Sequence, residues 1–252
     1  MSALRRPKPR LEGAQPELAR MQRRLLLRGG LSLGALGLLS GCDLSDNDVF
    51  DRILAAMSRW NDRVQAALFS EAKLAPTYPA SAITKPFPFN GYYSEDQAPS
   101  VDAAAWRLQL SGSIADKRPW TLAQLRTLPQ ESQITRLICV EGWSVIGQWS
   151  GVPFHLFLKR IGADTKARYV GFRCFDKYYS SIDMASALHP QTLLALDFAG
   201  QPLPREYGAP LRLRLPTKLG FKNPKYIAAL FVTNRYPGGY WEDQGYNWFS
   251  GS

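Results

Sequence analysis

The order of the expected secondary-structure elements predicts an α+β domain built from mixed sheets with short helices. Three observations lead to this prediction: the apolar runs have the length of short strands, the helical patterns between them are short, and the two do not alternate regularly as in a βαβ protein. With 252 residues, of which 45% are hydrophobic, the chain is long enough to bury one sizeable core.

The first expected element is an amphipathic helix over residues 49–70. Apolar side chains recur there at helical spacing, at Val49, Ile53, Met57 and Trp60, and continue at Val64 and Leu68. We expect this face to dock on the domain. The alternative of a membrane-surface helix is weaker, because acidic and basic residues are mixed along the segment, at Asp51, Arg52, Arg59, Asp62 and Arg63.

The segment that follows is extended and leads into the folded domain. Residues 75–100 contain five prolines, which exclude a helix, so we expect this chain to wrap over a surface. Thr121, placed after Pro119, is the expected N-cap of a short helix. Strands are expected at 106–110, 132–140, 169–175, 193–198, 211–215 and 226–233, helices or helical turns at 121–128, 153–161 and 182–188, and a turn at 200–202.

The net charge of +10 is concentrated in the first part of the chain. Residues 1–41 hold eight of the 31 basic residues but two of the 21 acidic ones, which leaves a net charge of +4 on the remainder. A nucleic-acid-binding face needs clustered basic residues on the folded part, so a nucleic acid is not an expected partner.

Residues 1–41 have the features of an export signal. Arg23, Arg24 and Arg28 precede a short apolar run from Leu31 to Leu39, which is too short for a transmembrane helix. The paired arginines fit the twin-arginine (Tat) export pattern; an ordinary Sec signal is the alternative, and Met21 is a possible start. We divide the chain into a signal peptide at 1–41, a tether with the amphipathic helix at 42–75, and a catalytic domain at 76–252.

The apolar run ends in Leu39-Ser40-Gly41-Cys42, which resembles the lipidation site of bacterial lipoproteins. Cys42 would then be acylated, and more than one acyl chain gives stable membrane attachment. Asp43 resembles a signal for retention at the inner membrane. We therefore expect a periplasmic protein with a lipid anchor on the outer face of the cytoplasmic membrane; a plain signal peptide with a chance cysteine is the alternative.

The other two cysteines, Cys139 and Cys174, have no CxxC spacing, so neither a zinc site nor a thioredoxin-type dithiol is expected. A lone cysteine in an apolar strand is ordinarily an inert core residue. Four neighbouring segments change that interpretation of Cys139: RLICVEGW at 136–143, VPFHLFL at 152–158, YGAPLRLRLP at 207–216 and GFKNPKYI at 220–227.

Together these segments resemble the sulfite oxidase-type molybdopterin-dependent oxidoreductases. The likeness is greatest to the branch of the periplasmic protein-methionine-sulfoxide reductase catalytic subunits, through the C-V-E-x-W run at Cys139, the sequence LHP at 188–190 and the sequence GFK at 220–222. The resemblance implies the sulfite oxidase-type fold. The chain stops where the larger sulfite oxidases carry a C-terminal dimerisation domain, so we expect that domain to be missing.

The resemblance also implies a molybdenum–molybdopterin (Mo-MPT) cofactor and the residues that hold it. Cys139 would be the metal ligand and catalytic centre, because molybdenum in a pterin dithiolene takes a soft thiolate ligand. Basic side chains would bind the pterin phosphate; their alternative role is that of solvated surface charges. The implied cofactor-binding residues are Asn90, Tyr93, Ser94, Cys174, Tyr207, Arg212, Lys222 and Lys225. Cys174 and Tyr207 depart from the family pattern, so the resemblance does not determine the substrate of this chain.

The expected enzyme moves an oxygen atom to or from an S-oxide or N-oxide, and protein methionine sulfoxide is one candidate substrate. Because no CxxCH haem signature is present, a membrane or periplasmic electron-transfer protein, haem- or quinol-linked, is the expected partner of a monomeric catalytic subunit. A sulfite dehydrogenase is one alternative, although the residues after Cys139 lack the arginines that a dianion would need. A lipoprotein binding module without turnover on the same fold is the other.

Overall fold

The computed structural model describes residues 48–70 and 73–251, and the chain divides into two units, Met1–Met57 and Ser58–Ser252. The contacts given below belong to the second unit. The signal peptide expected at 1–41 and the expected lipidation site Cys42 lie outside the described residues.

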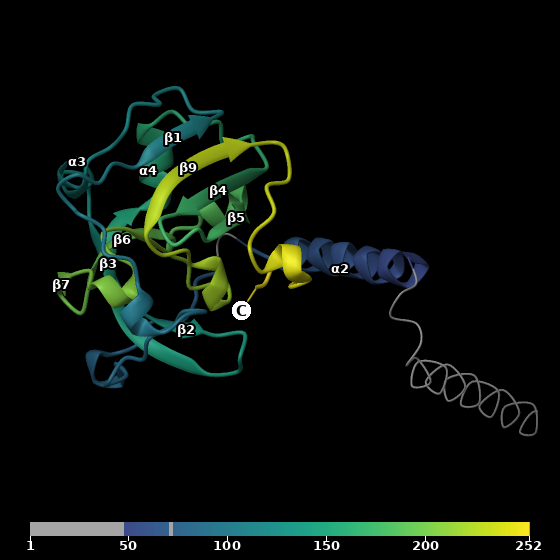
Figure 1. Ribbon diagram of the computed structural model, residues 1–252, viewed down its shortest axis with the longest axis horizontal. Helices are drawn as coiled ribbons and strands as arrows, with labels where there is room; N and C mark the ends of the chain where they lie inside the picture. The colour runs from purple at the N-terminus through teal and green to yellow at the C-terminus, as the bar shows by residue number, and fades with distance from the viewer. Residues whose placement is uncertain (1–47, 71–72, 252) are drawn as a thin grey trace, which may run out of the picture. The chain divides into compact units, whose positions relative to one another are not determined.

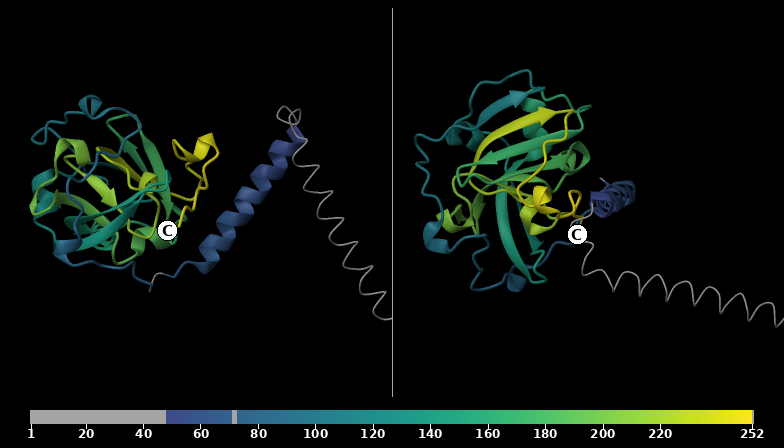
Figure 2. Two further views of the ribbon diagram at one scale, coloured as in Figure 1. Left: turned by 90° about the horizontal axis from the view of Figure 1, so that it is seen from below. Right: turned by 45° about the vertical axis from the view of Figure 1, so that its right-hand side comes forward.

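Two twisted sheets form the domain (Figures 1 and 2). One sheet has the order β1-β9-β4-β5, in which β1 and β9 are parallel and the other pairs antiparallel. The other has the order β2-β3-β6-β7, with β8 also paired to β6. The strands are β1 Gln109–Gly112, β2 Glu131–Ile138, β3 Ser144–Pro153, β4 Tyr169–Cys174, β5 Tyr179–Asp183, β6 Leu193–Phe198, β7 Gln201–Pro202, β8 Arg212–Arg214 and β9 Ile227–Thr233.

The helices are short, apart from the first. They are α2 Asp48–Leu68, α3 Leu122–Arg126, α4 Phe154–Arg160 and α5 Met184–Leu188, with short 3-10 turns at η1 Ala80–Ala82, η2 Glu95–Gln97, η3 Arg205–Tyr207, η4 Gly220–Lys222 and η5 Glu242–Gln244. Thr121 caps α3 as the sequence predicts, in a capping box with Gln124. The α+β class and the mixed sheets with short helices are therefore confirmed.

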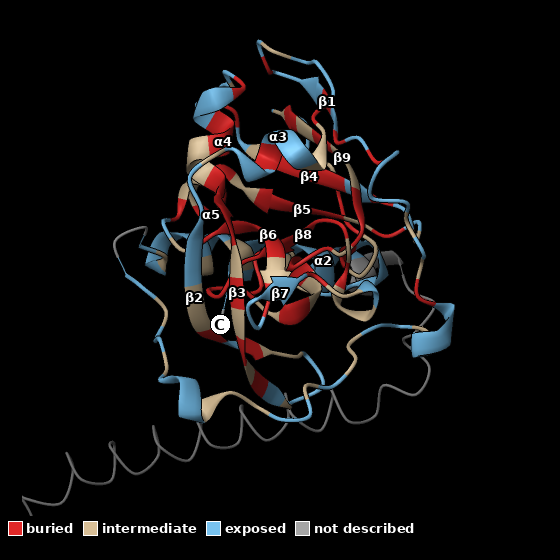
Figure 3. Cartoon of the chain, turned by 90° about the vertical axis from the view of Figure 1, so that its left-hand side faces the viewer, coloured by how far each residue is buried: buried red, intermediate tan, exposed pale blue. Residues whose placement is uncertain are grey.

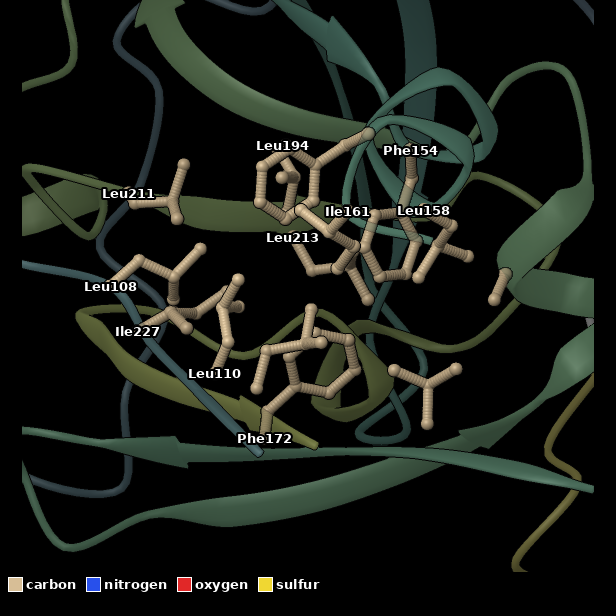
Figure 4. Packing of buried hydrophobic residues seen from close by; sticks show 14 of the residues in the cluster. Leu108, Leu110, Phe154, Leu158, Ile161, Phe172, Leu194, Leu211, Leu213 and Ile227 are labelled. Carbon is tan, nitrogen blue, oxygen red and sulfur yellow. The ribbon is translucent and has the colours of Figure 1, made fainter. Parts of the chain in front are cut away.

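The main core lies where residues of both sheets and of α4 meet. Leu194 and Leu213 come from the second sheet, Phe172 and Ile227 from the first, and Phe154 from α4; each has at most 1% of its surface exposed (Figure 4). Burial is greatest in β4, β5, β6 and β8, whereas β7 and most of β1 are exposed (Figure 3). This packing fixes the strand ends that carry the candidate site.

Three parts of the prediction need correction. The helical turn expected at 182–188 begins at Met184, because Ile182 and Asp183 end β5, a strand that the sequence did not predict. The strand expected at 106–110 begins later, at Gln109, because Leu108 forms an isolated bridge with Trp120 instead of joining the ladder. The sequence did not predict β3. Its inward positions include Gly147 and Gly151, which hide the apolar alternation, and a side chain at Gly151 would collide with the backbone of Leu194.

The way in which α2 docks also differs from the prediction. The expected apolar contact face is exposed at Trp60 and Leu68, with 66% and 80% of their surfaces accessible. Polar residues make the contact instead, because backbone N–H groups of residues 249 and 251 find acceptors in Asp62 and Gln65. The apolar stripe of this helix is therefore not used in the core.

Candidate active site

A pocket of about 650 Å³ lies where loops from both sheets converge. It collects most of the predicted site residues: Asn90, Tyr93, Cys139, Arg212 and Lys225 all line it. The remaining lining residues are Pro88, Phe89, Gly91, Tyr92, Val140, Glu141, Trp143, Ser144, Val145, Asp176, Tyr178, Gly220, Phe221, Asn223, Pro224 and Trp241. Within the described ranges, no group of three or more His, Cys, Asp or Glu could hold a metal ion by itself.

Cys139 is held at the first position of the turn that joins β2 to β3. Its N–H donates to the Trp143 carbonyl at 2.9 Å, and its own carbonyl accepts from Gly142 at 3.2 Å. Gly142 has a φ of 91°, a left-handed conformation that glycine adopts without strain. The turn therefore fixes the direction of the half-buried thiol relative to the strand.

Glu141 is the closest charged neighbour of this thiol. Its carboxylate lies 3.7 Å from Cys139 Sγ and is held by the Trp143 indole N–H at 2.9 Å. Burial raises the pKa of the Cys139 thiol, and Glu141 adds to the increase. The thiolate would thus need a cationic partner, and a bound metal supplies that charge.

Aromatic side chains and one carboxyl group form the wall of the pocket at the turn after β4. The Tyr93 hydroxyl donates to Asp176 Oδ2 at 2.8 Å, and the Tyr92 hydroxyl donates to the Asp176 carbonyl at 2.9 Å. Burial raises the pKa of the Asp176 carboxyl and raises the pKa of Tyr92 to about 12. Tyr240 stacks on Tyr92, with ring centroids 5.0 Å apart, and extends this wall with the C-terminal segment.

Arg212 and Lys225 are the two basic residues among the described pocket residues. Arg212 Nη1 donates to the Tyr207 carbonyl at 2.9 Å and its guanidinium lies 4.5 Å from the centre of the Trp149 ring. Its Nε is buried without a hydrogen-bond partner within residues 48–70 and 73–251. Lys225 Nζ donates to the Glu206 carbonyl at 3.2 Å.

Among the described residues, the two basic side chains face no carboxylate at ion-pair distance, although Asp176, Glu206 and Glu95 partly oppose the lowering of the Lys225 pKa. The ion pairs found in the described part of the chain involve neither residue. Burial lowers the pKa of Arg212 to about 10, and burial together with the nearby Arg212 charge lowers the pKa of Lys225 to about 7. Such a pair, with one N–H donor left over, fits an anionic group such as a phosphate.

Lys222 does not line the pocket, although the sequence grouped it with Arg212 and Lys225. Its side chain is buried against Glu242, with which it forms a short ion pair. The ammonium also faces the Trp248 ring, 5.1 Å from its centre. The structure therefore gives Lys222 a carboxylate partner inside the fold.

Three further predicted residues lie outside the lining of the pocket. Cys174, the last residue of β4, is buried in the main core. Tyr207 packs on Phe87 and donates its hydroxyl to the Phe87 carbonyl at 2.7 Å. Ser94 precedes η2 as its N-cap. Tyr207 still contributes through its backbone, because its carbonyl accepts from Arg212.

Two buried polar residues support the pocket from behind. The Asn223 side-chain oxygen accepts from Arg214 Nη1 at 3.0 Å and from the Leu215 N–H at 2.7 Å. Arg214 in turn donates to Thr135 Oγ1 at 3.1 Å and to the Arg136 carbonyl on β2. These bonds tie β8 and the segment carrying Lys225 to the strand that ends at Cys139.

Sequence reasoning missed several lining residues. Glu141, Trp143 and Asn223 lie in segments already quoted for the family resemblance. Their hydrogen-bonding side chains, near Cys139 or Lys225 in the sequence, could have indicated that they line the site. Asp176, an acidic residue two positions after a strand, carried a weaker signal. Trp241 comes from the distant C-terminal segment, and only the folded chain shows where it lies.

The family model for the oxidoreductase molybdopterin-binding domain matches residues 95–241. The chain belongs to this family of molybdopterin oxidoreductases and is an enzyme, and the predicted resemblance is confirmed. A putative protein-methionine-sulfoxide reductase subunit, YedZ1, of Azospira oryzae is 61% identical over 230 residues, which cover 91% of this chain and 88% of the relative.

More distant relatives share the central part of the chain. The protein-methionine-sulfoxide reductase catalytic subunit MsrP of Xanthomonas campestris is 34% identical over 162 residues, covering 58% of this chain and 50% of that protein. The sulfane dehydrogenase SoxCD from Paracoccus pantotrophus has a TM-score of 0.51 at 18% identity, covering 55% of this chain and 40% of that one. The likeness to SoxCD shows the shared fold.

Proposed function

We propose that the pocket holds a molybdenum–molybdopterin group and that the enzyme reduces an S-oxide or N-oxide. The observation that carries the proposal is the convergence of the Cys139 thiol with Arg212 and Lys225, which form no ion pair in the described residues, in one pocket of about 650 Å³. The family and the printed names of the relatives favour the methionine sulfoxide of a protein as one substrate.

Each proposed binding role follows from the chemistry of the side chain. Cys139 would supply the soft thiolate ligand, and the turn at Gly142 keeps that sulfur in place. Arg212 and Lys225 would bind the phosphate end of the pterin, which adds the negative charge that this pair lacks. Asn90 and Tyr93 are placed to contact the cofactor from the loop at 88–93.

The bound group would supply the two-electron redox chemistry. In the proposed direction an S-oxide gains two electrons and two protons and yields a sulfide and water. The fold restricts how a substrate can enter, since Tyr92, Trp143 and Trp241 line the pocket with aromatic surface. A neutral S-oxide with an apolar body suits such a wall.

A sulfite dehydrogenase remains the alternative within the enzyme class, but the pocket does not favour it. The two basic lining residues are accompanied by two acidic ones, Glu141 and Asp176. A dianionic substrate would have to approach Cys139 past the Glu141 carboxylate, which lies 3.7 Å from the sulfur. The non-catalytic binding module is set aside, because the chain belongs to an oxidoreductase family.

The cellular setting is part of the same proposal. We infer twin-arginine export through Arg23-Arg24, acylation of Cys42 and attachment to the outer face of the cytoplasmic membrane, where a haem- or quinol-linked protein would deliver electrons. Replacing both arginines with lysine should trap the protein in the cytoplasm. Cys42→Ala should leave a folded protein without acyl chains, visible as the missing lipid mass by mass spectrometry. An acylated Cys42→Ala protein would contradict the assignment.

The function is tested on native protein with a panel of substrates. Artificial electron donors should drive reduction of S-oxides, including oxidised methionine in a protein, and sulfite should be oxidised poorly with artificial acceptors. Sulfite turnover with inert S-oxides and N-oxides would reverse the assignment in favour of the alternative.

A further inference from the structure

The second half of α2 faces the domain with polar residues. Asp62 Oδ1 accepts from the Asn247 side-chain amide at 2.7 Å and from the Phe249 N–H at 2.9 Å. Gln65 Oε1 accepts from the Gly251 N–H at 3.2 Å. The C-terminal segment thus satisfies its backbone donors with side chains of the helix, and the acidic group of this half-helix is occupied by the domain.

Apolar side chains of the same half-helix remain exposed, and one of them, Leu68, borders a second pocket beside Gln65 and Gly251. Trp60 and Leu68, with 66% and 80% of their surfaces exposed, lie eight residues apart and therefore on one side of the helix. An exposed apolar stripe of this kind marks a binding surface, since isolated soluble chains keep such patches small.

The charges around the stripe favour a lipid surface over a protein groove. Arg59 and Arg63 are exposed on the helix, whereas Asp62 is turned to the domain and accepts two hydrogen bonds there. In the second half of the helix, the acidic Asp62 is therefore engaged by the domain while the two arginines stay exposed. Basic residues beside an apolar face that includes tryptophan are characteristic of helices that lie in the membrane interface.

The short length of chain between Cys42 and α2 is consistent with binding of the helix to a lipid bilayer. Residues 43–47 separate Cys42 from the first residue of α2, and five residues span at most about 17 Å when extended. An acylated Cys42 would keep the start of α2 close to the bilayer. Among residues 48–70 and 73–251, no helix has the length and apolar character to cross a bilayer.

We propose that the exposed apolar stripe in the second half of α2, formed by Trp60 and Leu68, binds an anionic lipid bilayer as an interfacial surface. The stripe would then be a second membrane contact, independent of acylation at Cys42 and of the chemistry in the pocket. It would hold the catalytic domain at the membrane, the place from which a membrane-bound electron donor can reach it.

The test measures vesicle binding by the full chain carrying Cys42→Ala, so that no acyl chain contributes. Vesicles of phosphatidylcholine with phosphatidylglycerol are floated on a density gradient, and the bound fraction gives the affinity. The variant Trp60→Gln/Leu68→Gln should bind about tenfold more weakly or worse, because two apolar side chains no longer enter the interface. The control Ala66→Gln, at an exposed position on another side of α2, should stay within about twofold of its parent.

The outcomes separate this inference from the proposed function. Thermal unfolding and the rate of S-oxide reduction in detergent should be alike in all three proteins, because neither Trp60 nor Leu68 lines the candidate site. A double variant that floats as well as its parent overturns the inference, as does a parent that does not float. If the parent protein binds native membranes only when the electron-transfer protein is present, the stripe binds a protein partner and the inference is wrong.

Discussion

Two pairs of buried or half-buried basic residues lie in the segment from Arg212, the first residue of β8, to Lys225, just before β9, and they differ in what balances their charge. Lys222 forms a buried ion pair with Glu242, and Lys218 lies 3.4 Å from a carboxylate oxygen of Asp183. Arg212 and Lys225 have no carboxylate partner in the described residues and line the pocket together.

Among these four residues, the difference separates cations paired within the fold from cations that line the pocket; Arg214, fully buried and without a carboxylate partner in the described part of the chain, is held by neutral acceptors instead. A buried charge that the protein itself neutralises is part of the fold, and removing one partner leaves the other uncompensated. A buried charge without a partner is unfavourable until an anion binds. Family resemblance grouped Lys222 with Arg212 and Lys225, and only the geometry separates them.

The largest expected effect is on the structural pair. Lys222→Met should lower the free energy of unfolding by about 3–5 kcal/mol, because Glu242 is left as a buried, unpaired carboxylate. Denaturant unfolding measures the loss, and Lys222→Met/Glu242→Gln, which removes the stranded charge, should recover much of it. Molybdenum per folded chain should stay near the wild-type level; its selective loss would place Lys222 among the cofactor ligands.

The pocket pair should respond in the opposite way. Arg212→Met and Lys225→Met each remove a charge-assisted hydrogen bond to the pterin phosphate, worth about 1.5–3 kcal/mol, or roughly 10- to 150-fold in cofactor affinity. Molybdenum content after dialysis measures retention, and turnover per molybdenum should change less. Full occupancy in both variants would locate the phosphate elsewhere.

Stability of the cofactor-free protein should increase with pH above neutrality. The folded pKa of Lys225 is lowered to about 7 by burial, below its ordinary value of 10.5, so between these values the unfolded chain binds the proton and the folded chain does not. The slope from one such group is at most about 1.4 kcal/mol per pH unit. Lys218, whose pKa burial also lowers to about 7, adds a second contribution.

The control for this pH dependence is Lys225→Met. Unfolding measured from pH 7 to 9 should show a smaller slope in the variant than in the wild type. Equal slopes would mean that Lys225 keeps its ordinary pKa, and the contrast between the two pairs of cations would lose one of its supports.

The smallest effect concerns Cys174. Cys174→Thr should cost about 1–2 kcal/mol of stability, because a hydroxyl replaces a thiol within the apolar core. Molybdenum content should be retained, since the residue lies outside the lining of the pocket. Thermal unfolding and metal analysis check both statements. Complete loss of molybdenum in a folded variant would give Cys174 a direct part in the site.

The sequence predicted the parts of the fold where local pattern and tertiary structure agree. The helix capped by Thr121 and the strand leading to Cys139 depend on capping and on apolar alternation, and both are found. Strand β3 escaped prediction because Gly147 and Gly151 occupy inward positions where close neighbours leave no room for a side chain. Close packing of this kind is a property of the folded chain and leaves no apolar signal.

The site residues also fall into those that the sequence predicts and those that only the fold distinguishes. Residues that extend from quoted segments into the pocket, such as Cys139 and Arg212, could be placed by resemblance. Lys222 and Lys225 stand three positions apart in one segment, and the 3-10 turn at 220–222 directs the first toward Glu242 while the second faces the pocket. Without the fold, no property of the two lysines distinguishes them.

The most direct test of the account is the molybdenum content of native protein, compared between the wild type and Cys139→Ser. A neutral hydroxyl is a poor ligand for a soft metal site, whereas the turn that holds residue 139 depends on backbone bonds and should persist. We expect equimolar molybdenum and S-oxide reduction in the wild type, and loss of both in a variant that unfolds at the same temperature as the cofactor-free wild type. A serine variant that keeps its molybdenum and reduces S-oxides at the wild-type rate would contradict the assignment of Cys139 as the metal ligand.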